Sequence, residues 1–227
     1  MKIVTNEKLI TRNKKIGNYL TIGSIVILGV GLYLSFQPEM IQYSYLALIL
    51  GFASSQFGIS FGNKFGRSPR PDEIINSSLK GLADTFTLYH YSGPVSHLLV
   101  GPAGIWILLP YAQKGTILYE KNKWQQKGGN FYLKLFAQEG IGKPDRDAKF
   151  AVTDVENFLK KENIASVEQY VKPALVFTNE KTVVTAPDAP VTTLHVSKLK
   201  DFIRKQAKQE SLLPEVTKPI IDVLPKE

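Results

Sequence analysis

The sequence contains no cysteine among its 227 residues. A chain without thiols forms no disulfide, binds no zinc through thiolates and has no cysteine nucleophile. Histidine is almost as scarce: His90, His97 and His195 are the only three, and no H-E-x-x-H pattern occurs. Their spacing matches no short zinc-binding motif, so we predict no metal site built on these residues.

Acidic residues are in deficit, with 20 Asp and Glu against 28 Lys and Arg, which gives a net charge of +8. The excess is distributed along the chain, because residues 1–61 carry five basic and two acidic residues and residues 62–227 carry 23 and 18. A positive balance of this size is compatible with a membrane surface or with nucleic acid as a partner.

Charge is missing altogether from two apolar segments of 21 residues, Ile16–Phe36 and Ile41–Phe61. About 20 apolar residues are needed to cross a bilayer as a helix. Only Gln37–Met40 separates the segments, which predicts a transmembrane helical hairpin. A signal peptide followed by a core helix is the alternative, but the first run is longer than the usual signal core and a second follows at once.

Basic residues flank this hairpin at one end only. Five precede it and three follow it: Lys2, Lys8, Arg12, Lys14, Lys15, Lys64, Arg67 and Arg70. The connecting turn has none. Because cytoplasmic loops carry the excess of Lys and Arg, we predict a cell-membrane protein with two spans and both termini cytoplasmic.

Two sets of residues within the spans indicate how the hairpin packs. Tyrosines lie towards the span ends, where amphipathic rings favour the membrane interface: Tyr19, Tyr33, Tyr43 and Tyr45. Small residues form a face on the second span: Gly51, Ser54, Ser55 and Gly58. Such a face allows close packing on the first span or on another copy, so the oligomeric state stays open.

The rest of the chain has the pattern of an α/β domain with a mixed sheet over residues 72–210. Residues 1–15 are interpreted as a basic cytoplasmic segment, 62–71 as a linker, and 211–227 as a tail with a short helix. Helices are expected over residues 71–83, 146–161, 197–208 with Ser197 as N-cap, and 215–224. Strands are expected over residues 86–91, 98–100, 105–109, 116–119, 131–136, 172–178 and 182–185.

The centre of this domain is predicted at Pro94–Pro110. Its two apolar runs, His97–Val100 and Ile105–Leu109, are joined by Gly101-Pro102-Ala103-Gly104. Pro and Gly supply the fixed and positive φ angles of a tight turn between strands. Because neither run alternates polar and apolar residues, both strands are expected to be covered on both faces.

The same stretch resembles the central hairpin of the NERD (nuclease-related) domain family, whose pattern is D-H-h-h-h-G-P-x-G-h-h-h-h-E-x-K, with h apolar. His97–Pro102 and Gly104–Leu108 are in register with it. Ser96 stands at the position of the Asp, Leu109 at that of the Glu and Tyr111 at that of the Lys. The resemblance extends more weakly over most of residues 72–210.

The resemblance implies a PD-(D/E)xK nuclease core, in which the Asp and Glu hold a divalent metal and the Lys steadies the developing charge. With all three replaced, it implies a domain without catalysis or cofactor that binds or scaffolds nucleic acid or another membrane protein at the bilayer. One alternative is a Mg²⁺-dependent nuclease with relocated ligands Glu73, Asp84 and Glu120, assisted by Lys121 or Lys123. Another is a structural subunit of a membrane complex.

A basic and aromatic segment, Lys114–Lys134, is the remaining candidate site. Its cations and rings alternate along the sequence: Lys114, Tyr119, Lys121, Lys123, Trp124, Lys127, Phe131 and Tyr132. Interleaved lysines and aromatic rings hold single-stranded nucleic acid by phosphate contacts and base stacking. The same residue types bind anionic lipid headgroups. A solvated hairpin with some core aromatic residues is the third interpretation.

Overall fold

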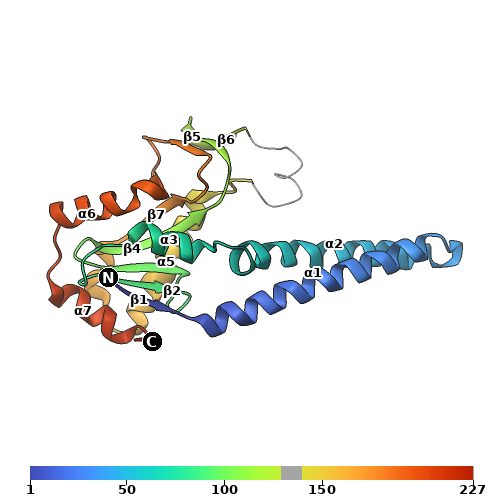
Figure 1. Ribbon diagram of the computed structural model, residues 1–227, viewed down its shortest axis with the longest axis horizontal. Coiled ribbons are helices and arrows are strands. Elements are labelled where there is room, and N and C mark those ends of the chain that lie inside the picture. The colour runs from blue at the N-terminus through green and yellow to red at the C-terminus, as the bar shows by residue number, and fades with distance from the viewer. Residues whose placement is uncertain (129–139, 227) are drawn as a thin grey trace. The chain divides into compact units, whose positions relative to one another are not determined.

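The computed structural model describes residues 1–128 and 140–226, and the chain divides into two compact units. The helical unit comprises Glu7–Arg70. The α/β unit comprises Met1–Asn6 and the described residues from Pro71 onward. Figure 1 labels the helices and strands of both units.

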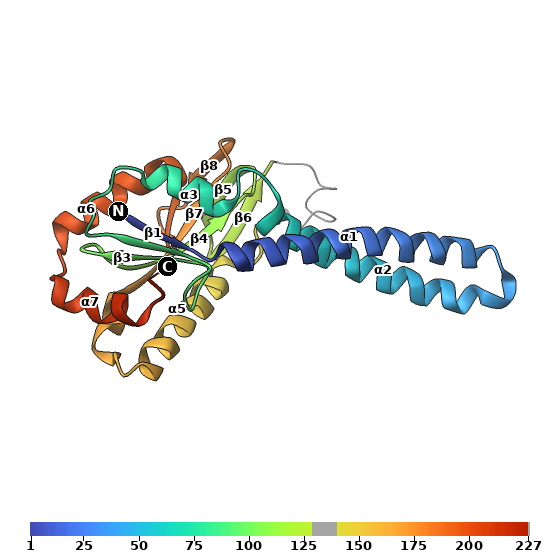
Figure 2. The same ribbon diagram turned by 60° about the horizontal axis from the view of Figure 1, so that its bottom comes forward.

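The helical unit is a hairpin of α1 (Glu7–Ser35) and α2 (Ile41–Phe61), joined by the 3-10 turn η1 (Pro38–Met40). Both helices are long and apolar enough to cross a membrane, and Figure 2 shows them side by side. Helix α2 matches the predicted span. Helix α1 begins nine residues earlier than predicted, because the polar Glu7–Lys15 continues the same helix. After α2, the chain makes one π-helical stretch, η2 (Gly62–Gly66).

Small residues at seven-residue intervals form the contact between α1 and α2. The buried positions are Ile10, Gly17, Ser24 and Gly31 on α1 and Ser44, Gly51 and Gly58 on α2. A repeat of seven keeps one face of each helix towards its partner. The approach is close: a Cβ on Gly58 would lie 2.6 Å from Oγ1 of Thr21. The hydroxyl of Ser44 also donates to the carbonyl of Gly31 at 2.8 Å.

The predicted small-residue face of α2 is therefore used within the hairpin, except at one position. Gly51 and Gly58 contact α1, and Ser54 donates to the carbonyl of Leu20 at 3.3 Å. Ser55 instead donates to the carbonyl of Phe52 in its own helix. The buried small residues of α2 recur every seven residues, so Ser44 belongs to this face although it was not among the predicted positions.

The α/β unit is built on a six-stranded mixed sheet, as predicted. Its strands are β1 (Lys2–Thr5), β2 (Thr87–His90), β3 (His97–Gly101), β4 (Gly104–Tyr111), β7 (Val171–Phe177) and β9 (Thr192–His195), in that spatial order. The β2–β3 and β3–β4 pairs are antiparallel and the others parallel. The turn from β3 to β4 places Gly104 at a φ of 109°, so the predicted central hairpin is confirmed.

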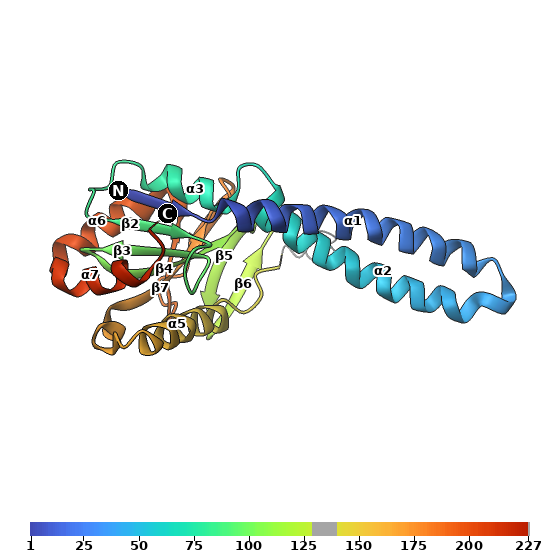
Figure 3. The ribbon, with the colours of Figure 1, turned by 90° about the horizontal axis from the view of Figure 1, so that it is seen from below.

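Helices cover both faces of this sheet, which makes every residue of β3 buried. On one face α3 (Pro71–Leu79) and α6 (Leu199–Gln209) pack on residues that include Leu99 and Trp106. On the other, α5 (Pro144–Lys161) and α7 (Pro214–Val223) pack on residues that include Leu98 and Ile107. Figure 3 shows α3 and α5 on opposite sides of the strands.

A second sheet has the strand order β6 (Lys123–Lys127), β5 (Gly115–Glu120) and β8 (Thr182–Thr185). The turn between β5 and β6 is Lys121-Asn122, with φ angles of 51° and 57°. No strand was expected between residues 119 and 131, so β6 was missed. The strand expected over residues 131–136 lies outside the described residues.

The predicted boundaries of the α/β domain were wrong at both ends. Strand β1 lies in the segment interpreted as a separate basic N-terminus, and it pairs in parallel with β2. Helix α7 lies in the segment interpreted as a tail, yet Ile220 and the following Leu224 are buried against the sheet. Both are short segments whose partners are remote in sequence, so no local pattern links them to the core.

The predicted N-cap at Ser197 was also wrong. A 3-10 turn, η4 (Val196–Lys198), precedes α6, and His195 is its capping residue. The ring nitrogen Nδ1 of His195 accepts from the backbone N–H of Ser197 at 3.3 Å.

Candidate functional site

The three positions that depart from the NERD pattern lie at one end of the β3–β4 pair. The register places Leu98 opposite Ile107. Ser96 directly precedes β3, and Leu109 lies two residues beyond Ile107 on β4. Tyr111 follows Leu109 by two residues and so points to the same face of the sheet. The geometry brings the three positions together, and they present a hydroxyl, an aliphatic side chain and a phenol, which form no carboxylate site for Mg²⁺.

Two aspartates from the start of α5 meet this end of the sheet. The hydroxyl of Tyr111 donates to Oδ2 of Asp147 at 2.9 Å. The indole N–H of Trp124 donates to Oδ1 of Asp145 at 2.8 Å. Burial, reinforced by the hydrogen bond to Asp147, raises the pKa of Tyr111 well above its usual value. Both carboxylates therefore have protein donors and fix α5 against β4 and β6.

The relocated nuclease ligands proposed as an alternative are on three separate elements. Glu73 is on α3, Asp84 is an exposed residue between α3 and β2, and Glu120 is exposed at the tip of β5. Asp84 binds the amino group of Met1, which lowers the pKa of its carboxyl. No group of three or more His, Asp or Glu side chains suited to a metal gathers anywhere in residues 1–128 and 140–226.

The basic and aromatic candidate is divided between two faces of the β5–β6 sheet. Tyr119 is paired with Trp124, and their rings meet at 5.0 Å with the Trp124 indole in a buried cluster around Ile117. Because side chains alternate along a strand, Lys123 and Lys127 point to the opposite face. On β6, Lys123 and Lys127 therefore lie on the opposite face of the sheet from the Trp124 ring. Phe131 and Tyr132 lie outside the described residues.

The other predicted lysines of this segment are exposed at its edges. Lys114 precedes β5, and Lys121 occupies the turn to β6 in a left-handed conformation. In the described part of the segment, Trp124 packs against the cluster around Ile117, while Lys114, Lys121, Lys123 and Lys127 are exposed.

A buried histidine pair lies on the sheet face covered by α3. His90 and His97 are opposite each other on β2 and β3, and their Nδ1 atoms are 2.7 Å apart. Nε2 of His90 lies 2.9 Å from Oδ1 of Asn76 on α3. If Asn76 accepts this proton, neutral His90 accepts at Nδ1 from the Nδ1–H of His97. The histidine that matches the NERD pattern is thus part of a polar network that joins the central hairpin to α3.

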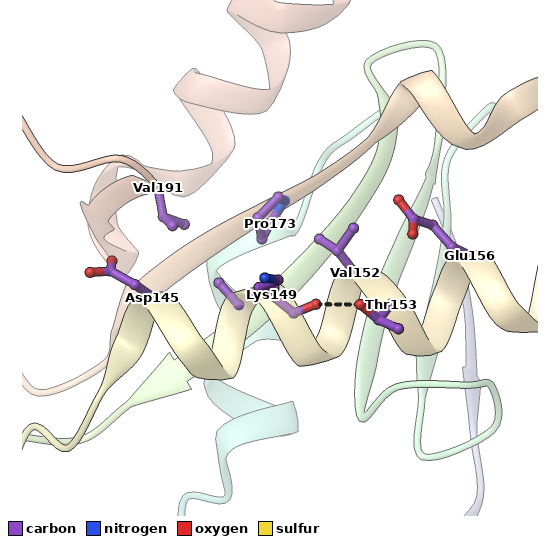
Figure 4. Close-up of a pocket in the computed structure, with 8 residues that line it drawn as sticks. Asp145, Lys149, Val152, Thr153, Glu156, Pro173 and Val191 are labelled. Carbon is purple, nitrogen blue, oxygen red and sulfur yellow. Dashed lines mark hydrogen bonds between the residues drawn. The ribbon is translucent and has the colours of Figure 1, made fainter.

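A groove of about 320 Å³ runs along α5 beside β7. Figure 4 shows Val152, Pro173 and Val191 as its apolar part, with Asp145, Lys149 and Glu156 around them. The side chains around it are charged and partly exposed, and none of the predicted site residues lines it. The groove provides an amphipathic surface beside α5.

One sequence pattern with a catalytic spacing also occurs in the hairpin. Gly58–Gly62 reads G-I-S-F-G, which matches the G-x-S-x-G of serine hydrolases. That motif acts on a sharp turn from a strand to a helix. Here it lies at the end of α2 and the start of η2, so the geometry for an exposed nucleophile is missing at this site.

Comparisons with protein-family models, with curated proteins and with solved structures found no match to this chain.

Sequence reasoning missed three contributors to these sites. Asp145 and Asp147 have an i, i+2 spacing that gives no motif, and only the fold brings them to Trp124 and Tyr111. Asn76 matches no catalytic or metal-binding pattern, and only the fold brings its amide to His90. Asn122 was the one local sequence signal for the hairpin turn. Asn favours the left-handed region of positive φ, which Lys121 and Asn122 both adopt.

Proposed function

We propose that this protein is a membrane-anchored binding or scaffolding domain that resembles NERD and lacks metal-dependent catalysis. The helical hairpin is the anchor, and the α/β unit is the cytoplasmic module that holds a nucleic acid or another membrane protein at the bilayer. One observation carries the anchoring part of this proposal: the outer surface of the hairpin is apolar along both helices.

Many of the side chains exposed on the hairpin are large and apolar, and their contact with water is unfavourable. Tyr19, Ile25 and Ile49 are each at least 66% exposed, and they have counterparts from Ile16 onward on α1 and from Ile41 to Phe57 on α2. The large apolar residues face outward and the small ones face the partner helix. This is the arrangement expected where lipid surrounds the helices and close packing holds them together.

Topology is tested by reporter fusions to the full chain. A reporter inserted at Glu39, in the turn, and one at the C-terminus should report opposite sides of the membrane. The positive-inside rule places the turn outside. Reporters on the same side at both positions would contradict the hairpin anchor.

The catalytic part of the proposal rests on Ser96, Leu109 and Tyr111 together with the absence, in the described residues, of a metal-binding cluster. Without converging carboxylates, residues 1–128 and 140–226 have no group to place Mg²⁺ against a phosphate, and each 1.4 kcal/mol of lost transition-state stabilisation slows cleavage about tenfold. Purified full-length protein in detergent should leave single- and double-stranded DNA and RNA intact in Mg²⁺ and in Mn²⁺.

The variants Glu73→Ala and Glu120→Ala are the controls for this assay. Cleavage abolished by either substitution would overturn the inactive interpretation in favour of relocated ligands. Cleavage that persists in both variants would indicate a contaminating nuclease. Binding without cleavage that weakens steeply with added salt would indicate contacts to phosphates.

A further inference from the structure

The outward face of α1 carries an ordered series of side chains along its length. Opposite the buried positions, successive turns hold Lys8, Arg12, Lys15, Tyr19, Ile22, Val26, Val30 and Tyr33. All eight residues are exposed within the structure. The series runs from three cations through one phenol and three aliphatic side chains to a second phenol. Headgroups, interface and hydrocarbon of a bilayer follow one another in the same sequence.

The contacts between the helices place the exit from α2 at the level of these cations. Gly17 lies against Phe61, Thr21 against Gly58 and Leu28 against Gly51. At the open end of the hairpin, Arg70 pairs with Glu7 at 3.7 Å.

Arg12, Lys15 and the exposed Arg67 fall between the Gly17–Phe61 contact and the Glu7–Arg70 ion pair. Helix α1 and the segment that follows η2 therefore contribute basic residues to the same end of the hairpin. We name Lys8, Arg12, Lys15 and Arg67 the basic collar. Lys64 is at the same end, but its ammonium lies 5.5 Å from the centre of the Phe65 ring, and the collar is defined without it.

Acidic residues are almost excluded from this end of the hairpin. Glu39 is the only acidic residue from position 8 to position 71, and it lies in the turn at the opposite end. The hairpin thus has two chemically different ends. One has the basic collar together with the exposed Lys14 and Lys64 next to Tyr19, and its carboxylate, Glu7, is paired with Arg70; the other has Tyr33 and the carboxylate of Glu39.

We propose that the basic collar binds the headgroups of anionic phospholipids in the leaflet next to Tyr19. This inference rests on the proposed membrane anchor and adds lipid selectivity at one end of it. Each basic residue near an anionic bilayer surface strengthens association about fivefold. Cations held on α1 and directly after η2, at the level where the apolar surface begins, place their charge at headgroup depth without inserting further apolar side chains.

The test uses the full-length chain with a tryptophan at either end of the α1 series, Tyr19→Trp or Tyr33→Trp. Each variant is reconstituted in phosphatidylcholine vesicles with one fifth phosphatidylglycerol, and either lipid carries bromine on its acyl chains to quench nearby tryptophan. The signal of the unsubstituted protein, from Trp106 and Trp124, is subtracted. We expect position 19 to prefer brominated phosphatidylglycerol about two- to fivefold over phosphatidylcholine, and position 33 to show no preference.

Charge variants then assign the preference to the collar. Arg12→Gln with Lys15→Gln should remove it at position 19, and 0.5 M NaCl should weaken it. Lys149→Gln with Lys160→Gln, which removes two exposed lysines from α5, is the matched control and should leave it unchanged. Equal quenching by both lipids at position 19 would overturn the proposal, as would a preference that survives the Arg12 and Lys15 substitutions. Absence of quenching by either lipid at both positions would instead overturn the membrane anchor itself.

Discussion

The two units of this protein distribute side-chain size in opposite ways. In the α/β unit the buried residues are large, such as Leu99, Trp106 and Ile107, and each is at most 2% exposed. Between the two spans of the hairpin the buried residues are Gly and Ser, with Ile10 and Phe65 buried only at the open end, and most large apolar side chains of the spans point outward. One chain thus contains a core of large side chains and a seam of small ones.

The difference follows from the solvent that each unit suits. In water, folding is driven by removing large apolar surface from solvent, so such residues collect inside. In lipid that drive between helices is absent, and close backbone approach with van der Waals contact holds the helices together. Large apolar residues therefore lie inside the α/β unit and on the outside of the hairpin. The same kind of substitution should have different effects in the two units.

The largest effect is expected in the core of the α/β unit. Leu99→Asp places an unpaired carboxylate in a fully buried position of β3, which costs several kcal/mol against a typical total stability of about 5–15 kcal/mol. Circular dichroism of the full chain in detergent should show loss of the α/β unit's unfolding transition. Val183→Asp, at an exposed position of β8, is the control and should melt nearly as the unsubstituted protein. Equal melting of both variants would show that β3 is not core.

The same kind of substitution on the hairpin tests which solvent surrounds it. Ile25→Asp puts a charge on the outward face of α1, where insertion of aspartate at the centre of a span costs about 2.5–3.5 kcal/mol. The fraction of protein that resists alkaline extraction from membranes should fall. Phe150→Asp, at a similarly exposed position on α5, should not change it. If both variants remained in the membrane fraction unchanged, the outward face would not be in contact with lipid.

A smaller effect is expected when the seam is widened. A Cβ on Gly58 would lie 3.0 Å from the backbone N of Thr21, so Gly58→Leu must separate the helices, at about 1–3 kcal/mol. Titration with SDS in mixed micelles should unfold this hairpin at a lower SDS fraction. Gly23→Leu has no atom within 4 Å of the added Cβ and serves as control. Similar destabilisation by both substitutions would argue against a seam at Gly58.

The ionisation of a buried tyrosine, Tyr89, makes the stability of the α/β unit depend on pH in the alkaline range. Tyr89 is buried in β2, and burial raises its pKa to about 12, with a further contribution from the charge of Asp222. Its hydroxyl keeps its proton in the folded state after the unfolded chain has lost it at about pH 10. The contribution of Tyr89 to the free energy of unfolding is therefore constant below pH 10 and falls by about 1.4 kcal/mol per pH unit between pH 10 and 12. Urea unfolding at several pH values should show a smaller decline for Tyr89→Phe, and an unchanged decline would exclude Tyr89 as its source.

Much of the fold was predictable because its elements have strong local patterns. The charge-free runs predicted α2 to the residue, and the apolar runs around Gly101–Gly104 predicted β3 and β4. Strand β1 was not predictable in this way, because four residues near the N-terminus pair with a strand more than 80 positions away. Helix α1 was predicted too short, since the polar residues before Ile16 continue a helix without changing its hydrogen bonding.

The candidate site was predictable as a set of positions but not as a surface. Ser96, Leu109 and Tyr111 were found by alignment to a pattern, and strand register brings them to one end of β3 and β4. The lysines and rings of residues 114–127 alternate in sequence, which suggested one mixed surface. A strand sends alternate residues to opposite faces, and hydrogen bonding to Asp145 on α5 directs Trp124 inward.

Composition and spacing by themselves determined that the chain has two apolar helices, an α/β domain with a mixed sheet, and no acidic residues at the positions of the nuclease pattern. These properties are local, since each depends on residues within about 20 positions of one another. Only the tertiary structure decided that residues 2–5 and 214–224 belong to the core, that Asp145 and Asp147 are engaged by Trp124 and Tyr111, and that the hairpin seam repeats every seven residues. Such contacts join distant parts of the chain, and packing selects them only when all the elements are in place.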